Sequence, residues 1–126
     1  MSSAKAYVGR RDGDDIAHVE VEVSSDGQTK GYPLRHVVRH SPTGMEWGYG
    51  GSGPADLANS ILADHLDMQG GVSQLLYQQF KTEVVARMPR DGWRLAGSRI
   101  NEWLNQRWSH MDDTAIQADL SAGSVI

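Results

Sequence analysis

The chain has 126 residues, no cysteine, and 16 acidic against 12 basic residues, which gives a formal net charge of −4. The length predicts one domain with a single core, and the absence of cysteine excludes disulfides, thiol catalysis and Cys-ligated metal centres. The acidic balance disfavours general nucleic-acid binding, which depends on neutralising phosphates. No apolar run is long enough for a transmembrane segment or signal peptide, so we expect a cytoplasmic protein without a membrane partner.

The first half of the chain has the patterns of an antiparallel sheet. Val19, Val21 and Val23 alternate with polar residues, which predicts a strand with one buried face. The sequence Ser-Pro-Thr-Gly at residues 41–44 is typical of a type I turn between two strands. We therefore predict a sheet of three or four antiparallel strands within residues 4–49. Its other strands are expected at residues 5–10, 34–40 and 45–49.

The second half has the patterns of amphipathic helices, because apolar residues recur there at the spacing of one helical face. Together with the sheet, these helices predict an α+β fold. The expected helices cover residues 54–66, 72–88 and 98–108, with a short strand or extended piece around Trp93 and Leu95.

The charge is distributed unevenly along the chain. Residues 68–108 carry six bases and three acids, whereas residues 109–126 carry three acids and no Lys or Arg. The last segment is also small and polar and has no apolar periodicity, which is typical of a flexible or partner-binding tail. We therefore expect a single α+β domain over residues 1–108, followed by an acidic, flexible tail over residues 109–126.

A glycine-rich segment leads from the last expected strand into the first helix. Glycine lets the backbone approach a ligand closely, and the first N–H groups of a helix attract anions. A Walker lysine is missing, and the surrounding pattern is not that of a parallel dinucleotide-binding fold. The segment is either a tightly packed corner or a site for a phosphate-bearing small molecule. Its candidate ligand-binding residues are Trp47, Gly48, Tyr49, Gly50, Gly51, Ser52 and Gly53.

Histidines and acids offer the only candidates for acid–base chemistry. His36 and His40 are four residues apart, but four residues of a strand span about 13 Å, which is too far for one metal ion. His18, His36 and Glu20 would form an acid–base cluster if the sheet brought them together. The run Asp12-Gly13-Asp14-Asp15 lacks the spacing of a calcium loop and predicts a solvated turn. We assign no catalytic residue, metal ligand or cofactor.

Arginines and tryptophans gather in the basic part of the chain. Arg and Trp are the residue types that dominate protein-interface hot spots, although a solvated helix surface and core tryptophans would produce the same composition. Four tryptophans in so small a domain also make a homodimer plausible. The candidate partner-binding residues are Arg87, Arg90, Trp93, Arg94, Arg99, Trp103, Arg107 and Trp108.

The run HSPTGMEWGYGGSGPADLA, residues 40–58, resembles the signature of a small uncharacterised domain family found in bacteria, phages and plasmids. Residues 7–10, residues 77–81 and the piece from Trp93 to Leu104 extend the resemblance over about residues 5–105. Met45 stands where the signature leads us to expect Phe. The resemblance implies one compact α+β domain in a mobile-element setting, and it implies no activity.

Two classes of function remain, with a third behind them. The first is a non-enzymatic binding protein of a phage or mobile element that docks on a host protein or defence complex, as an anti-CRISPR-like inhibitor does. The second is a protein that binds or sequesters a nucleotide or phosphate through the glycine-rich segment. The third, which has the least support, is a small hydrolase or nuclease that uses a histidine and an acid. If phage-encoded, the protein would act in the cytoplasm of the host.

Overall fold

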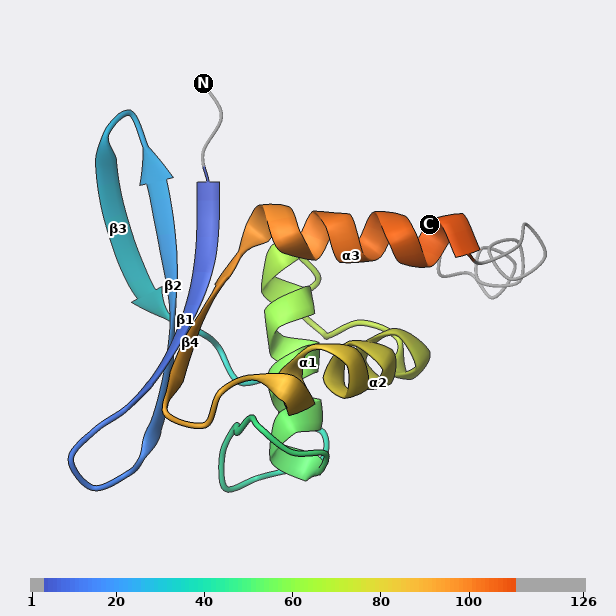
Figure 1. Cartoon of the computed structure of the whole chain (residues 1–126), viewed down its shortest axis with the longest axis horizontal. Coiled ribbons are helices and arrows are strands. Elements are labelled where there is room, and N and C mark those ends of the chain that lie inside the picture. The colour runs from blue at the N-terminus through green and yellow to red at the C-terminus, as the bar shows by residue number, and fades with distance from the viewer. Residues whose placement is uncertain (1–3, 111–126) are drawn as a thin grey trace.

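The protein is a two-layer α+β domain in which three helices cover one face of a four-stranded sheet (Figure 1). The computed structural model describes residues 4–110, and their side chains as far as Arg107. The expected tail, residues 109–126, therefore lies almost entirely outside the described residues. The prediction of an α+β fold with an antiparallel sheet and three helices is confirmed.

The sheet has the strand order β3-β2-β1-β4, and every neighbouring pair is antiparallel. Tyr7 of β1 lies opposite Val21 of β2 on one side and Leu95 of β4 on the other. The predicted alternation in β2 is confirmed, because Val19 and Val21 are buried beneath the helices. The strands are β1 (Ala4–Arg11), β2 (Ala17–Ser25), β3 (Gln28–Pro33) and β4 (Gly92–Ala96).

Two of the expected strands were wrong, since residues 34–40 and 45–49 form irregular segments. Apolar side chains of both segments do enter the core, as the burial of Leu34, Val37 and Trp47 shows. The backbone N–H of Leu34 still donates to Val19 of β2, but no strand ladder continues from there, and later N–H groups bond to the helical layer. The backbone N–H of Val37, for example, donates to the Ser60 hydroxyl at 2.8 Å. The fourth strand of the sheet is instead β4, in the segment around Trp93 and Leu95 that the sequence predicted as a short strand or extended piece.

The helices follow the predicted segments with shifted ends. The first helix begins earlier than expected, with Gly51 as the N-cap, so Gly53 and Pro54 lie inside its first turn. The second is capped by the Ser73 hydroxyl, which accepts from the backbone N–H of Leu76, and it ends well before the expected residue 88. The helices are α1 (Ser52–His65), α2 (Gln74–Glu83) and α3 (Gly97–His110), with a short 3-10 turn, η1 (Val85–Arg87), after α2.

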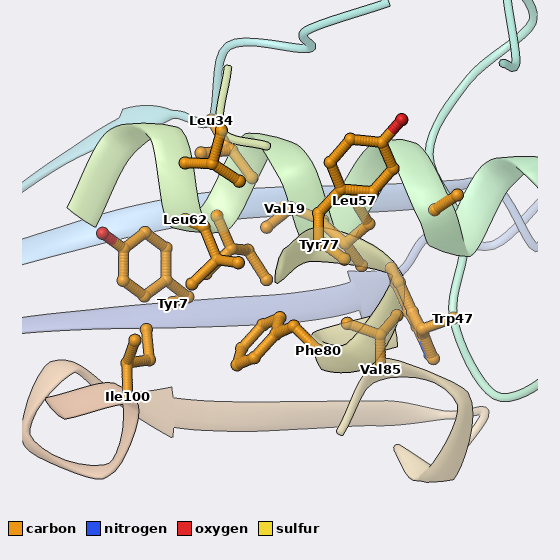
Figure 2. Close-up of a cluster of buried hydrophobic side chains, with 14 of the residues drawn as sticks. Tyr7, Val19, Leu34, Trp47, Leu57, Leu62, Tyr77, Phe80, Val85 and Ile100 are labelled. Atoms are coloured by element: carbon orange, nitrogen blue, oxygen red, sulfur yellow. The ribbon is translucent and has the colours of Figure 1, made fainter. Parts of the chain in front are cut away.

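One continuous core lies between the sheet and the helices, and it joins side chains from nearly every element (Figure 2). Tyr7, Val21, Leu57, Ile61 and Ile100 have essentially no exposed surface. Helix α1 runs through the middle of this core and has buried residues around most of its circumference. The middle of α1 is therefore covered by other elements, and its two ends lie near the surface of the molecule. In the described part of the chain, no helix has the length and apolar character needed to cross a membrane.

Candidate functional site

The candidate site is a surface groove beside the N-terminal end of α1. It consists of two hollows of 340 and 280 Å³ that share Asp15, Glu46 and Tyr49 as lining residues. One wall is the turn between β1 and β2, and the other is the glycine-rich segment that precedes α1. We call this feature the Tyr49 groove. Its full lining is Arg11, Asp15, Ile16, Ala17, Ser41, Thr43, Gly44, Met45, Glu46, Trp47, Gly48, Tyr49, Gly53 and Arg90.

The glycine-rich wall rests on a buried tryptophan. Trp47 is only 1% exposed, its Nε1 donates to the backbone oxygen of Arg90 at 2.9 Å, and the Arg11 guanidinium lies 4.5 Å from the centre of its ring. The Trp93 ring packs edge-on against it, with 5.5 Å between the ring centres. Gly48 then turns the chain with a φ of +90°, a conformation that favours glycine. These contacts fix the position at which Tyr49 leaves the core.

A carboxylate on α1 fastens the segment that leads into the groove. The carboxylate of Asp56 is 0% exposed and accepts hydrogen bonds from the backbone N–H groups of Arg39, His40 and Ser41 at 2.9–3.2 Å. It also lies 2.8 Å from Nε2 of His36. Burial acts to raise the pKa of Asp56, but the bonds from His36 and the three amides outweigh it and hold this pKa below its usual range. Asp56 therefore serves as an ionised internal anchor.

The charged residues of the groove are already paired with one another. Arg11 donates to both oxygens of Glu46, at 3.2 and 2.8 Å, and Arg90 forms an ion pair with Asp15. Arg11 also donates to the backbone oxygen of Arg90 at 2.8 Å, which joins the two pairs into one network. Since each charge has an opposite neighbour, the groove offers no free charge for a charged ligand.

Two large apolar side chains are uncovered among the polar residues of the groove. Ile16 is 55% exposed and Tyr49 is 52% exposed, although both are large apolar side chains. They come from segments more than thirty residues apart, yet they line the same hollow together with Met45. The sequence analysis did not single out Ile16. The available signal was an isolated large apolar residue directly after the polar run from Asp12 to Asp15.

The structure divides the seven predicted ligand-binding residues between core and surface. Trp47 is enclosed by protein, so its ring cannot stack on a ligand, whereas Tyr49 can. Gly53 packs so tightly on Glu46 that an added Cβ would lie 2.9 Å from Cβ of Glu46. A Glu side chain thus stands beside the helix N-terminus that was considered for an anion. Gly48, Gly50, Gly51 and Ser52 complete the turn into α1.

The predicted partner-binding residues do not meet in one patch among the described side chains. Arg94 lies on the face of the sheet without helices and pairs with Glu22, while Arg99 and Arg107 lie on α3 and pair with Glu102 and Glu83. Trp93 packs on Trp47, and Trp103 packs on Phe80 with ring centres 5.0 Å apart. Arg87 is exposed, Arg90 belongs to the Tyr49 groove, and the side chain of Trp108 lies outside the described set. Their role in partner binding stays a prediction.

The histidines lie apart from one another. His18 is on the helix-free face of the sheet and bonds to Asp12, whereas His36 is on the helical side and bonds to Asp56 of α1. His40 bonds to the Tyr77 hydroxyl at 2.7 Å, and the expected cluster of His18, His36 and Glu20 is not assembled. Asp12 caps the turn after β1 with bonds from the backbone N–H groups of Asp14 and Ile16. Within residues 4–110 no group of three or more His, Asp or Glu side chains could hold a metal ion.

The resolved pKa shifts all favour the ordinary charge state of each group. Burial opposes the charged form of the carboxyl and basic groups, but their hydrogen bonds outweigh it, so the pKa of the carboxyls is lowered and that of the bases is raised. For the tyrosines that bond to Asp64, burial and the hydrogen bond both raise the pKa. The lowered groups are Asp12, Asp15, Asp56, Asp64 and Glu83, the raised bases are Lys5, Arg11 and Arg90, and the raised tyrosines are Tyr7 and Tyr32.

Fold and site together define a small two-layer α+β domain with a closed core and a groove with two exposed apolar side chains at the N-terminal end of its central helix. The chain belongs to DUF6166, a family of unknown function whose match covers residues 7–106. This match spans the whole described domain except the first half of β1 and the end of α3. No curated protein and no solved structure matches the chain.

Proposed function

We propose that this protein is a non-enzymatic binding protein that docks on another protein through the Tyr49 groove. The observation that carries the proposal is that two exposed large apolar side chains, Ile16 and Tyr49, line the same hollow although they come from distant parts of the sequence. Interface hot spots are enriched in tyrosine and are surrounded by polar groups that exclude water. The groove has this composition.

The chemistry of the groove defines the segment that it would accept. The ion pairs Arg11–Glu46 and Arg90–Asp15 are internal, so a charged group of the partner would gain little and would lose its hydration. An uncharged apolar side chain would cover Ile16, Tyr49 and Met45 and remove their surface from water, which stabilises by roughly 25 cal/mol per Å². The Thr43 hydroxyl at the rim is available to bond with the partner's backbone. The expected occupant is therefore an apolar side chain on an uncharged stretch of a partner protein.

The resolved pKa shifts of the domain belong to side chains that hold the fold together. A general acid or base works best when its pKa lies near the working pH. Among the described residues, each resolved shift moves a group away from neutrality instead, as the lowered pKa of the hydrogen-bonded Asp56 illustrates. The side chains that have unusual pKa values here are structural anchors.

The nature of the partner rests on the resemblance to proteins of phages and plasmids. In that setting a small protein without catalytic groups acts most simply by occupying a surface of a host protein. We therefore propose a host protein, with a defence complex such as a CRISPR effector as the first class to examine, in the host cytoplasm. The protein would inhibit it by steric coverage.

The test compares variants of the groove with a matched surface variant. Epitope-tagged wild type, Tyr49→Ser, Ile16→Ser and Leu75→Ser are expressed in the natural host, and the proteins retained with each are quantified by mass spectrometry. Leu75 is 60% exposed and lies on α2, outside the groove, so Leu75→Ser controls for the loss of any exposed apolar side chain. We expect one stoichiometric host protein that is retained by wild type and Leu75→Ser and is lost with both groove variants. Recovery of the same proteins with all four chains, or of none, would contradict the proposal.

A further inference from the structure

A second cavity lies at the opposite end of α1 from the Tyr49 groove. It has a volume of 220 Å³ and is half open to solvent, and it is formed where β1, β3, the segment after β3, the last turns of α1 and the following loop meet. None of its lining residues belongs to the Tyr49 groove. We call it the Asp64 cavity. Its lining residues are Lys5, Tyr32, Arg35, Val37, Ser60, Ala63, Asp64, Asp67, Met68 and Gln69.

One side of the cavity is a hydrogen-bond network that is already satisfied. The Asp64 carboxylate accepts from Nζ of Lys5 at 2.8 Å, from the Tyr7 hydroxyl at 2.5 Å and from the Tyr32 hydroxyl at 2.7 Å. Tyr7 is fully buried, so this network ties β1 and β3 to the end of α1. Lys5 and Asp64 neutralise each other, and this side of the cavity therefore has no net charge.

Two charges of the cavity remain uncompensated. The Arg35 guanidinium donates one hydrogen bond, from Nη1 to the neutral backbone oxygen of Gln69 at 2.7 Å, and its other N–H groups are unused among the described residues. Within the same residues, the exposed carboxylate of Asp67 has no hydrogen-bond or ion-pair partner. Arg35 and Asp67 line the same cavity but do not pair with each other. The cavity thus presents one free positive and one free negative group at separate positions.

The rest of the wall and the size of the cavity restrict what fits between these groups. Val37, Ala63 and the half-exposed Met68 give an apolar surface. A volume of 220 Å³ corresponds to about seven water molecules at roughly 30 Å³ each. It lies below the range of about 300–1,000 Å³ that is typical of sites for drug-sized ligands. The cavity therefore suits a molecule smaller than a typical drug, with a short apolar part.

We propose that the Asp64 cavity binds a small zwitterion, namely a free α-amino acid with an apolar side chain. Its carboxylate bonds to the unused N–H groups of Arg35, its ammonium group bonds to Asp67, and its side chain lies against Met68 and Val37. Both charged contacts are charge-assisted hydrogen bonds, which are about twice as strong as neutral ones. This site is independent of the proposed docking at the Tyr49 groove, and no chemical reaction is involved.

The mixed charge of the cavity gives the selectivity for a zwitterion. A ligand with only a carboxylate would bond to Arg35 but would lie near the unpaired Asp67. A ligand with only an ammonium group would meet Asp67 but would lie near the unpaired Arg35. Each of these two ligands bonds to only one of the two residues and is repelled by the charge of the other. Only a ligand with both groups satisfies the two residues together.

The test is a calorimetric titration of the full chain with L-leucine, N-acetyl-L-leucine and L-leucine amide. The acetyl group removes the ammonium charge, and the amide removes the carboxylate charge. We expect saturable binding of L-leucine and binding at least about tenfold weaker for each blocked analogue, which corresponds to the loss of one charge-assisted contact. Absence of saturable binding by L-leucine, or equal binding of the three compounds, would overturn the proposal.

Variants assign the two contacts separately. Asp67→Asn is expected to remove the preference for leucine over N-acetyl-leucine, and Arg35→Gln to remove the preference for leucine over leucine amide. Asp91→Asn and Arg39→Gln change exposed charges outside the cavity and should leave both preferences intact. A thermal melt of each variant verifies that it is folded. If Asp67→Asn or Arg35→Gln keeps its preference, the assignment of that contact is wrong.

Discussion

Helix α1 carries two aspartates, Asp56 and Asp64, whose carboxylates both accept several hydrogen bonds but lie in different surroundings. Asp56, near the N-terminal end, is sealed from solvent and accepts its bonds from one irregular segment, residues 36–41. Asp64, near the C-terminal end, accepts its bonds from two strands and faces an open cavity. This difference indicates that a hydrogen-bonded carboxylate acts only as a structural anchor when protein covers it completely. The same kind of carboxylate can border a ligand site when one side of it is open to solvent.

The two ends of α1 also differ in what they leave exposed. The N-terminal end has paired charges and uncovered apolar side chains, Ile16 and Tyr49, which suit a protein surface. The C-terminal end has apolar walls and two unpaired charges, Arg35 and Asp67, which suit a small polar molecule. The two ends of one helix therefore border two surfaces that differ in whether their charges are paired.

The largest expected effect comes from Asp56→Ala. This change leaves three backbone N–H groups, those of Arg39, His40 and Ser41, without their acceptor. Each unsatisfied buried donor costs about 1–3 kcal/mol. Because two of these residues can partly reach water, we expect the free energy of unfolding to fall by about 3–5 kcal/mol in total. Urea denaturation measures this, and a loss below about 1 kcal/mol would show that Asp56 is not an anchor.

A smaller effect is expected from Asp64→Asn. The amide oxygen can still accept from one tyrosine, and Lys5 is partly exposed, so water can replace the lost ion pair. We expect a decrease of about 1–2 kcal/mol in the free energy of unfolding. Asp67→Asn, in the loop that follows α1, is the matched control and should change stability by less than about 0.5 kcal/mol. If Asp64→Asn lowers the free energy of unfolding as much as Asp56→Ala does, the two aspartates do not differ in their structural role as described.

The two aspartates also predict how stability depends on pH. Hydrogen bonds outweigh burial and hold the pKa of both carboxyls below the ordinary value of 3.8. The folded chain therefore binds fewer protons than the unfolded chain, so this stabilisation is complete above pH 4–5 and is lost as the pH falls through the lowered pKa values. We expect the free energy of unfolding to fall from about pH 4 downward. The fall should be shallower in Asp56→Asn, and an unchanged slope in that variant would contradict the account of Asp56.

The smallest effect on stability is expected in the Tyr49 groove itself. Ile16 and Tyr49 are more than half exposed, so Ile16→Ser and Tyr49→Ser remove little buried surface. Each should change the free energy of unfolding by less than about 0.5 kcal/mol. A loss above about 1.5 kcal/mol in a thermal or urea melt would show that these side chains belong to the core and would weaken the case for docking.

The sequence predicted the parts of the fold that depend on local pattern. The alternation of Val19, Val21 and Val23 and the helical spacing from Leu57 to Leu62 depend on which side chains face the core, and both were read correctly. Residues 34–40 were misread as a strand because Val37 and Val38 favour strands locally. Their backbone is held by Ser60 and Asp56 instead, and side chains from another element are not visible in a local pattern.

The candidate site was predicted only in part for the same reason. The glycine-rich segment forms one wall of the Tyr49 groove, and Tyr49 is exposed there, but its role as a ligand-binding segment stays a prediction. Ile16 and Asp15 come to the groove through the pairing of β1 with β2, which sets where the turn between them lies. The Asp64 cavity joins Lys5, Tyr32 and Asp67 from three separate segments, and the sequence contains no local signal for it.

Site-specific photo-crosslinking tests the central claim most directly. A photoreactive phenylalanine analogue is placed at Tyr49 in one chain and at Leu75 in another, and both chains are irradiated in the natural host. We predict a discrete crosslinked host protein from the probe at position 49, which disappears when Ile16→Ser is added, and none from the probe at position 75. No crosslink at position 49, or the same product from both positions, would contradict docking at the Tyr49 groove.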